Sequence, residues 1–412
     1  MKEDIWANRK LGDIADIIMG QSPDGNSIND SEGIEFHQGK LAFGEKYLKH
    51  SNNYTSKPTK IAPTHSLLLC VRAPIGTLNI TDREVCIGRG LCAINANNQT
   101  SNKFLYYALS NQQNYFEENA TGSTFKAIST ALIKGTKIPI PPISEQQAIA
   151  NFLDKKTGEI DQAIALLETQ KTDLQAYRQA LITETMTKGL NPNAPMKDSG
   201  IQWIGEIPES WCITRIKYLA NTQENSFIDG DWIESPYVTD IGIRYLTSGN
   251  IGNGVFKRQG NGYITEDTFQ KLNCKYAYPG DLVFCRLNQP FGRSCILPDD
   301  QDRYVLAVDN VILRTNEDKR YICYLTQLER YQNYIGMLAN GTAMQRISRT
   351  KLGNVNVPLP PLSEQHVIAD YLDKKTSDID TALNQMDTQI ADLQAYRTAL
   401  ISEAVTGKID VR

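Results

Sequence analysis

The sequence predicts an α+β protein made of two mixed α/β domains and a pair of long helices, with internal pseudo-twofold symmetry. The first observation is a repeat: when the 412-residue chain is shifted by 219 residues, 28 of the 47 positions at 141–187 are identical. The second is that both repeated segments lack Gly and Pro after their opening prolines, apart from Gly158, as long helices do. The third is that short apolar runs bounded by Gly, Pro, Asn and Asp occupy the other segments, which indicates strands and turns.

Both repeated segments carry an apolar residue at every seventh position, which is the spacing of a coiled coil. Each helix of about 44 residues would be ~66 Å long at 1.5 Å per residue. A helix of this length with one apolar stripe is not stable alone in water, so we predict that the two form an antiparallel coiled coil between the domains. The residues expected to pair are Leu153, Ile160, Leu167, Leu174 and Leu181, and Leu372, Ile379, Met386, Leu393 and Leu400.

The start of the first helix carries a capping pattern. Ser144 is a suitable N-cap, and Gln147 stands three residues later, as a capping box requires. In the second copy Ser363 keeps the cap, but His366 replaces the glutamine and leaves the box incomplete.

These boundaries divide the chain into globular domains at 1–140 and 201–357, helices at 141–190 and 358–412, and a linker at 191–200. The domains share landmarks in the same order: 38–44 with 248–254, 67–76 with 282–292 (one residue longer), and 122–129 with 341–348. Segments 102–118 and 318–337 are expected to be helices with aromatic faces. A shared scaffold with divergent loops is typical of a pair of recognition modules.

The formal net charge of −4 argues, taken alone, against nucleic acid as a partner. The acidity is concentrated in the repeated segments, however, because 144–190 and 363–412 together carry −6 and the other segments carry +2. A near-neutral domain gains little affinity from phosphates alone, so we expect a partner that supplies basic surface.

The composition excludes several classes of protein. There is no run of 18 apolar residues for a membrane span and no secretory signal at the N-terminus. The eight cysteines form no Cys-x-x-Cys pair and are expected to be reduced in a cytoplasmic protein, with disulfides or a zinc site as the alternative. The four histidines lack metal-ligand spacing, and no nucleotide-binding loop or nucleophile elbow is present. We therefore expect neither a metal site nor catalysis.

Several ordered motifs resemble those of one family. Pro-Pro-x-Ser-Glu-Gln begins both helices at 141–146 and 360–365, and the segment 197–208, Val71–Gly76 and Gly88–Gly90 match further motifs of that family. With the duplicated plan, these resemble the specificity subunit of type I restriction–modification enzymes. The second domain departs from the pattern at Arg286-Leu287-Asn288, where one residue is inserted.

The resemblance implies that each globular domain is a target-recognition domain that recognises one half of a bipartite, asymmetric site on double-stranded DNA. The helices would set the spacing between the halves and dock two methyltransferase subunits, which restriction subunits join. This chain would be non-catalytic and bind no cofactor, with S-adenosylmethionine and ATP on the partner subunits. Two rival functions stay open, a protein scaffold that binds no DNA and a single-chain DNA enzyme.

Base recognition favours Arg for guanine and Asn or Gln for adenine. The candidate DNA contacts in the first domain are Gln38, Lys40, Arg72, Arg89 and Lys126; those in the second are Ser248, Asn250, Arg286, Asn288, Arg293, Gln345 and Arg346. The alternative for each is a turn residue or a surface polar group that is already hydrogen-bonded within the fold.

Overall fold

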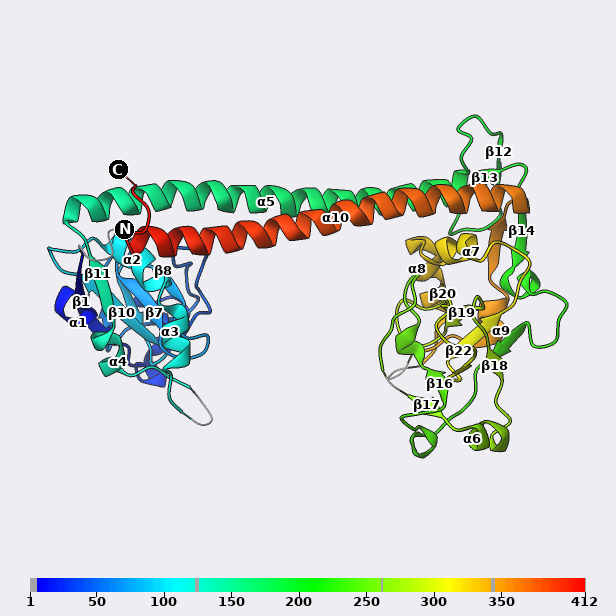
Figure 1. The fold of residues 1–412 in the computed structure, drawn as a ribbon, viewed down its shortest axis with the longest axis horizontal. Coiled ribbons are helices and arrows are strands. Elements are labelled where there is room, and N and C mark those ends of the chain that lie inside the picture. The colour runs from blue at the N-terminus through cyan, green and yellow to red at the C-terminus, as the bar shows by residue number, and fades with distance from the viewer. Residues whose placement is uncertain (1–5, 123–125, 261, 342–344, 412) are drawn as a thin grey trace. The chain divides into compact units, whose positions relative to one another are not determined.

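The computed structural model describes residues 6–122, 126–260, 262–341 and 345–411. Parts of the landmarks at 122–129 and 341–348 lie outside the described residues. The chain divides into two compact units: unit 1 comprises 1–169 and 386–412, and unit 2 comprises 170–385. Each unit contains one globular domain and part of each long helix (Figure 1).

The globular domain of unit 1 contains two main sheets. The first has the strand order β2-β10-β7-β8 and the second β3-β5-β4-β9-β6, and β1 pairs with β11 outside them. The strands are β1 (Ala7–Lys10), β2 (Ala15–Met19), β3 (Ile28–Asn29), β4 (Ile34–His37), β5 (Tyr54–Thr55), β6 (Ile61–Ala62), β7 (Leu67–Cys70), β8 (Leu78–Ile80), β9 (Val85–Ile87), β10 (Leu91–Ala96) and β11 (Lys137–Ile140). The helices are α1 (Leu11–Ile14), α2 (Asn102–Ser110), α3 (Gln113–Glu118) and α4 (Thr130–Gly135), with a 3-10 turn at Gly25–Ser27.

Unit 2 repeats this plan. The sheet β15-β22-β19-β20 corresponds to β2-β10-β7-β8, the sheet β17-β16-β21-β18 replaces the second one, and β14 pairs with β23. The strands are β14 (Cys212–Arg215), β15 (Phe227–Asp229), β16 (Ile243–Leu246), β17 (Tyr263–Ile264), β18 (Tyr276–Ala277), β19 (Leu282–Cys285), β20 (Ser294–Ile296), β21 (Tyr304–Leu306), β22 (Asn310–Leu313) and β23 (Asn356–Leu359). The helices are α6 (Glu266–Lys271), α7 (Lys319–Thr326), α8 (Glu329–Leu338) and α9 (Arg349–Gly353), with 3-10 turns at Ile216–Leu219, Ser235–Tyr237 and Ser248–Asn250.

Both faces of the central strands are buried, which explains their continuous apolar runs. In β7, Leu67 and Leu69 join the apolar cluster that contains α2, whereas Leu68 and Cys70 face the cluster of the second sheet. β19 divides its side chains in the same way between two clusters. The predicted shared scaffold is confirmed, and each predicted aromatic helix is two helices, α2 with α3 and α7 with α8.

The predicted linker contains regular structure. β12 (Met196–Asp198) lies within 191–200 and pairs antiparallel with β13 (Glu206–Pro208). Between the two strands, Trp203 packs against Tyr331 and Tyr334 of α8. The segment is therefore a hairpin held on unit 2 by aromatic contacts.

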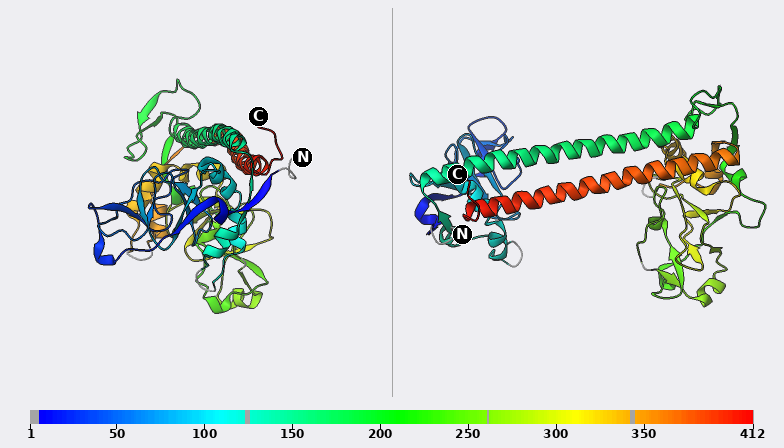
Figure 2. Two further views of the ribbon diagram at one scale, coloured as in Figure 1. Left: turned by 90° about the vertical axis from the view of Figure 1, so that its left-hand side faces the viewer. Right: turned by 45° about the horizontal axis from the view of Figure 1, so that its top comes forward.

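The two long helices are α5 (Ile143–Lys188, 46 residues) and α10 (Leu362–Val405, 44 residues). Within each unit, the segments of the two helices run side by side and antiparallel (Figure 2). In unit 1, Arg397 Nε lies 2.9 Å from Asp161 Oδ1, and in unit 2, Arg178 Nε lies 3.3 Å from Asp380 Oδ1. These pairs occupy equivalent positions of the repeat, so the same contact between the helices is made once in each unit.

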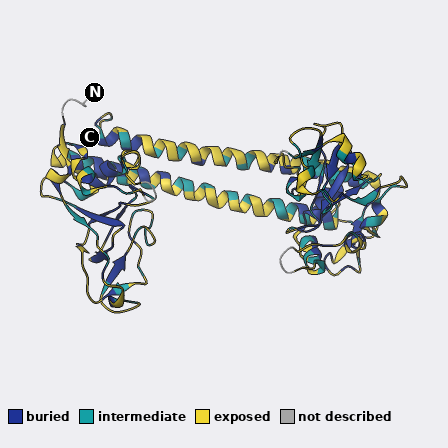
Figure 3. Ribbon diagram, turned by 90° about the horizontal axis from the view of Figure 1, so that it is seen from below, coloured by how far each residue is buried: buried dark blue, intermediate teal, exposed yellow. Residues whose placement is uncertain are grey.

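The ten predicted pairing residues differ in burial along the helices (Figure 3). Five of them are buried: Leu153, Ile160, Leu372, Ile379 and Leu400. The other five are half-buried: Leu167, Leu174, Leu181, Met386 and Leu393. Because Leu153, Ile160 and Leu400 belong to the apolar cluster of unit 1 and Leu372 to that of unit 2, the helices pack on the globular cores as well as on each other.

The predicted capping box is wrong. α5 begins at Ile143, so Ser144 lies inside the first turn, and the carbonyl of Pro142 accepts the first helical hydrogen bond from Gln146 N at 3.0 Å. α10 likewise begins at Leu362, one residue before Ser363. Pro142 and Pro361 therefore stand directly before the helices, at the N-cap positions that were predicted for Ser144 and Ser363.

A buried glutamine attaches the start of each long helix to its globular domain. Gln146 Oε1 accepts a hydrogen bond from Ser101 N (2.8 Å), and Nε2 donates to Pro141 O (2.9 Å). Gln365 makes the equivalent bonds with Asp318 N (3.0 Å) and Pro360 O (2.9 Å). Because Ser101 and Asp318 precede the first turns of α2 and α7, the glutamine joins the starts of two helices.

A second attachment lies two turns further along each long helix. The hydroxyl of Tyr107 donates to Asp154 Oδ1 (2.6 Å), and that of Tyr324 donates to Asp373 Oδ1 (2.7 Å). The same tyrosine oxygens lie 3.3 and 3.1 Å from the hydroxyls of Thr157 and Thr376. These bonds explain why Asp and Thr recur in both copies of the Leu-Asp-Lys-Lys-Thr motif.

Replacing the buried glutamine tests its structural role. Gln146→Leu nearly preserves the side-chain volume but leaves the part-buried Ser101 N and the buried Pro141 O unpaired, and each unsatisfied buried group costs roughly 1–3 kcal/mol. We expect the free energy of unfolding, measured by urea titration, to fall by about 2 kcal/mol or more. Gln147→Leu is the matched control, because Gln147 is its exposed neighbour. Equal urea midpoints for the two variants would contradict the role.

Candidate nucleic-acid interface

Four separate loops of unit 1 meet at the ends of its central strands. Gly88 N, after β9, donates to His37 O, at the end of β4 (2.8 Å). Val71 N, after β7, donates to Gly90 O (3.0 Å), and Val71 O accepts from Ile128 N, before α4 (3.0 Å). These bonds join the loops that follow β4, β7 and β9 to the segment before α4.

The five candidates predicted in the first domain all lie on this loop cluster. Gln38 and Lys40 follow β4, Arg72 follows β7, Arg89 lies in the turn after β9, and Lys126 precedes α4. All five side chains are exposed. The structure therefore brings together residues that are spread over about 90 positions of sequence, and their contact with DNA stays a prediction.

Sequence reasoning missed two residues of the same cluster. Leu41 is 96% exposed beside Lys40, and it was overlooked because only polar types were considered. Ser22 was missed because its position depends on Gly20, where a Cβ would lie 2.1 Å from Gly88 O. That close approach places Ser22 Oγ 3.5 Å from Arg89 N.

A buried carboxylate supports the strand that leads into this cluster. Glu35 Oε2 lies 2.6 Å from Arg83 Nη2 and 3.1 Å from His37 Nε2, and its Oε1 lies 2.6 Å from His50 Nδ1. Burial raises the pKa of Glu35, but the hydrogen bonds from Arg83, His50 and His37 outweigh it and lower this pKa to about 2. Burial is also the main cause that lowers the pKa of His37. Glu35 is therefore ionised at neutral pH and fixes the residue before Gln38.

Backbone hydrogen bonds show which residues of unit 2 correspond to this cluster. Val71 N donates to Gly90 O at 3.0 Å, and the equivalent bond of unit 2 runs from Arg286 N to Asp309 O at 2.8 Å. Arg286 is therefore the counterpart of the buried Val71, and its own side chain is only 7% exposed.

The counterpart of Arg72 is the next residue of unit 2. Arg72 forms an isolated bridge with Ala127, as Leu287 does with Arg346. The two arginines of this landmark, Arg72 and Arg286, are therefore not equivalent. The inserted residue is Asn288, which has a φ of 58°.

The sequence alignment of 38–44 with 248–254 is wrong at its C-terminal end. Gly44 N donates to Tyr47 O at 3.2 Å, and the equivalent bond in unit 2 runs from Gly252 N to Val255 O at 2.9 Å. Gly44 therefore corresponds to Gly252 and not to Gly254, since the loop after β16 is shorter than that after β4.

Three of the predicted contacts in unit 2 are hydrogen-bonded within the fold. Arg286 donates to Ile347 O (3.2 Å) and to Val308 O, and pairs with Asp229. Arg293 donates to the carbonyls of Ser248 (2.9 Å), Ile251 (2.6 Å), Leu287 (3.2 Å), Asn288 (3.1 Å) and Pro290 (3.1 Å). Asn250, 3% exposed, accepts from Thr247 N (2.9 Å) and donates to Gln259 O (2.8 Å). Because these three side chains donate hydrogen bonds to backbone carbonyls of neighbouring loops, we assign them to loop support.

The other four candidates of unit 2 remain accessible. Asn288, Gln345 and Arg346 are exposed and Ser248 is half-buried. Asn288 N donates to Gln345 O at 3.2 Å, which joins the inserted residue to the segment before α9. The contact of these four side chains with DNA stays a prediction.

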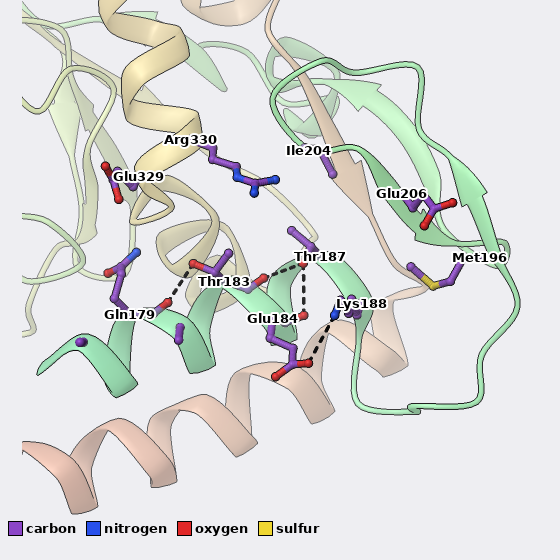
Figure 4. Close-up of a pocket in the computed structure, with 12 residues that line it drawn as sticks. Gln179, Thr183, Glu184, Thr187, Lys188, Met196, Ile204, Glu206, Glu329 and Arg330 are labelled. Carbon is purple, nitrogen blue, oxygen red and sulfur yellow. Dashed lines mark hydrogen bonds and ion pairs between the residues drawn. The ribbon is translucent and has the colours of Figure 1, made fainter. Parts of the chain in front are cut away.

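A groove runs along the last turns of α5 in unit 2, between the β12–β13 hairpin and α8 (Figure 4). Its lining includes Thr183, Thr187, Glu206 and Arg330. The hydroxyl of Thr183 donates to Gln179 O (2.8 Å) and that of Thr187 donates to Thr183 O (2.7 Å). Both hydroxyls are engaged with the helix backbone, so the groove is suited to binding more than to nucleophilic chemistry.

The described residues contain no group of three or more His, Cys, Asp and Glu that could hold a metal ion. All eight cysteines are free thiols, and all but Cys212 are buried. Burial raises the pKa of Cys70 to about 11 and that of Cys92 to about 12, so these thiols are protonated at neutral pH. Within the described part of the chain, no helix combines the length and apolarity that a membrane crossing requires.

The fold and the loop clusters define a protein with two recognition domains on a repeated helical frame. The family model for the type I restriction modification DNA specificity domain matches residues 3–175 and 208–389. The chain belongs to this family, and one match falls in each copy of the repeat.

Relatives and solved structures agree with this assignment. The chain is 38% identical to the putative MjaX specificity subunit of Methanocaldococcus jannaschii over 173 residues, which is 42% of this chain and 40% of that protein. It is 23% identical to the MjaVIII specificity subunit of the same organism over 421 residues, 99% of this chain and 93% of that one.

Two solved structures share the fold. One comes from work on the complex assembly and conformational transition of the type I R-M system; it has a TM-score of 0.78 and 16% identity over 98% of both chains. The HsdS subunit of Thermoanaerobacter tengcongensis has a TM-score of 0.59 and 18% identity, over 98% of this chain and 97% of that one.

Proposed function

We propose that this chain is the non-catalytic specificity subunit of a type I restriction–modification complex and recognises a two-part, asymmetric site on double-stranded DNA. One observation carries the proposal: two domains of the specificity family share one scaffold, yet they present different side chains from equivalent loops. Where unit 1 exposes Arg72, unit 2 has Leu287. Because different side chains recognise different bases, the two half-sites differ.

The long helices support two equivalent docking surfaces for methyltransferase subunits. Tyr177 of α5 and Tyr396 of α10 occupy the same position of the repeat, and each is 55% exposed. Exposed aromatic residues are enriched at protein interfaces. The same surface presented twice would bind two copies of one partner, and the net charge of −6 on the repeated segments favours a basic partner surface.

The chemistry of the complex belongs to the partners in this proposal. The methyltransferase subunits would bind S-adenosylmethionine and methylate adenine, and restriction subunits would use ATP. This chain would bind neither cofactor, and the complex would act in the cytoplasm. Its own residues would orient two loop clusters toward DNA.

Exchanging one recognition domain tests the modular recognition. Replacing residues 1–140 by the matching domain of a relative, in a host with the methyltransferase partner, should change one half of the methylated sequence and leave the other unchanged. Sequencing that maps methylated adenines measures both halves. The proposal fails if both halves change, or if neither does.

The same host distinguishes the two rival functions. A scaffold without DNA recognition predicts no sequence-specific methylation that depends on this chain. A single-chain enzyme predicts methylation or cleavage by the purified chain without partners. Either result would replace the proposal.

Removing the exposed cations of the unit 1 loop cluster tests the candidate contacts. An arginine that recognises a base contributes roughly 1–3 kcal/mol of discrimination, whereas a lysine on phosphate weakens binding to all sequences. We expect Arg72→Ala to relax the specificity of one half-site, and Lys126→Ala to weaken binding and reduce its salt dependence. Fluorescence anisotropy of labelled duplexes measures both effects.

The matched control for these variants is Lys137→Ala. Lys137 is an exposed cation of the same unit, but it lies on β11 and outside the loop cluster. If Lys137→Ala weakens binding as much as the other two changes do, the loop cluster is not the contact surface.

A further inference from the structure

Trp232 differs in exposure from the other tryptophans of the chain. It is 69% exposed, whereas Trp6, Trp203 and Trp211 are 9%, 7% and 1% exposed. Leaving a large apolar ring in water forgoes the stabilisation of burial. Packing within unit 2 therefore does not explain why a tryptophan stands at position 232.

The backbone before Trp232 lies beside the recognition loops of unit 2. Gly230 N donates to Asn310 O (2.9 Å), and Asp231 N donates to Leu306 O (2.8 Å). Trp232 is thus held next to the turn at 307–309, which connects β21 to β22.

The same bonds identify the counterpart of Trp232 in unit 1. There Gly20 N donates to Leu91 O (2.9 Å), and Gln21 N donates to Ile87 O (3.0 Å). Ser22 is therefore equivalent to Trp232, and it contacts the predicted DNA-binding residue Arg89.

This segment is fixed by its neighbours. A Cβ at Gly230 would lie 2.3 Å from Ala307 O, so only glycine permits this approach of the two backbones. The carboxylate of Asp231, 8% exposed, accepts from Lys275 N and pairs with Lys275 Nζ, both at 2.8 Å. The backbone that carries the exposed ring is thereby held in place.

Arg286 connects this segment to the turn at 307–309. Its guanidinium lies 3.1 Å from Asp229, three residues before Trp232, and donates to Val308 O. The residue that sequence analysis assigned to DNA contact thus positions the loops on both sides of Trp232.

The two units carry polar side chains in one case and apolar side chains in the other at these equivalent positions. Unit 1 has Ser22 and the exposed Arg89, whereas unit 2 has Trp232 and the half-buried Val308. A polar pair is suited to hydrogen bonds with base edges, and an apolar pair is suited to contact with the methyl group of thymine. The substitution therefore changes the kind of contact that this loop can make.

We propose that Trp232 makes an apolar contact with a thymine methyl group in the major groove of the second half-site and contributes to the specificity of that half, with Arg286 as its positioning residue. This inference rests on the proposed function, since it requires that unit 2 faces DNA. It adds a contact that differs in kind from those of unit 1.

The test uses the complex of the full chain with its methyltransferase partner and a duplex that carries the mapped methylation site. Loss of this apolar contact predicts that Trp232→Ala weakens binding by roughly 10-fold or more, and Trp232→Phe by less because a ring remains. Tyr218→Ala is the control, since Tyr218 is 65% exposed in the same unit and should leave affinity unchanged. The difference in emission between wild type and Trp232→Phe isolates the Trp232 fluorescence, which the specific duplex should change because it removes the ring from water.

The outcomes separate the two proposals. If the wild-type complex does not bind the duplex, the proposed function fails and the inference fails with it. If the wild type binds but Trp232→Ala binds equally well, or the duplex leaves Trp232 emission unchanged, the inference alone is overturned. Loss of affinity in Trp232→Ala with unchanged affinity in Tyr218→Ala supports it.

Discussion

The hydrogen bonds of a buried glutamine at the start of each long helix are the contacts on which the other features of the structure depend. Gln146 and Gln365 are fully buried, and each joins its helix to the first turn of an aromatic helix. A tyrosine–aspartate–threonine group repeats the attachment two turns later. A domain held at both points cannot rotate about its helix without leaving buried polar groups unpaired, which is costly.

The pairing of the helices depends on apolar packing more than on charge. The equivalent pairs Arg397–Asp161 and Arg178–Asp380 are partly exposed, and surface ion pairs contribute little to stability. These pairs instead fix the register of the two helices, because each arginine meets its aspartate in only one alignment of the antiparallel helices. Buried residues such as Leu153 and Leu400 of unit 1 and Leu372 of unit 2 supply most of the stabilisation.

The sequence predicted the repeat, the two helices and the shared scaffold, since these follow from periodicity and from self-alignment. It did not predict which polar residues are buried. Arg286 was predicted to contact DNA but supports a loop. The predicted hydrogen bond at the start of the first long helix was placed at Ser144, whereas the buried Gln146 makes the bond that attaches this helix to its domain. Burial of a polar side chain depends on partners distant in sequence, such as Ser101 for Gln146, which a local pattern does not contain. Trp232 was missed because its exposure follows from the approach of Gly230 to another strand.

One repeated frame holds two domains whose loops are free to differ. The most direct test of this claim is a genome-wide map of methylated adenines in a host that expresses this chain with its methyltransferase partner. One frame that holds two different domains predicts one bipartite target with two different half-sites and a spacer of constant length. A continuous target, or two identical half-sites, would contradict it.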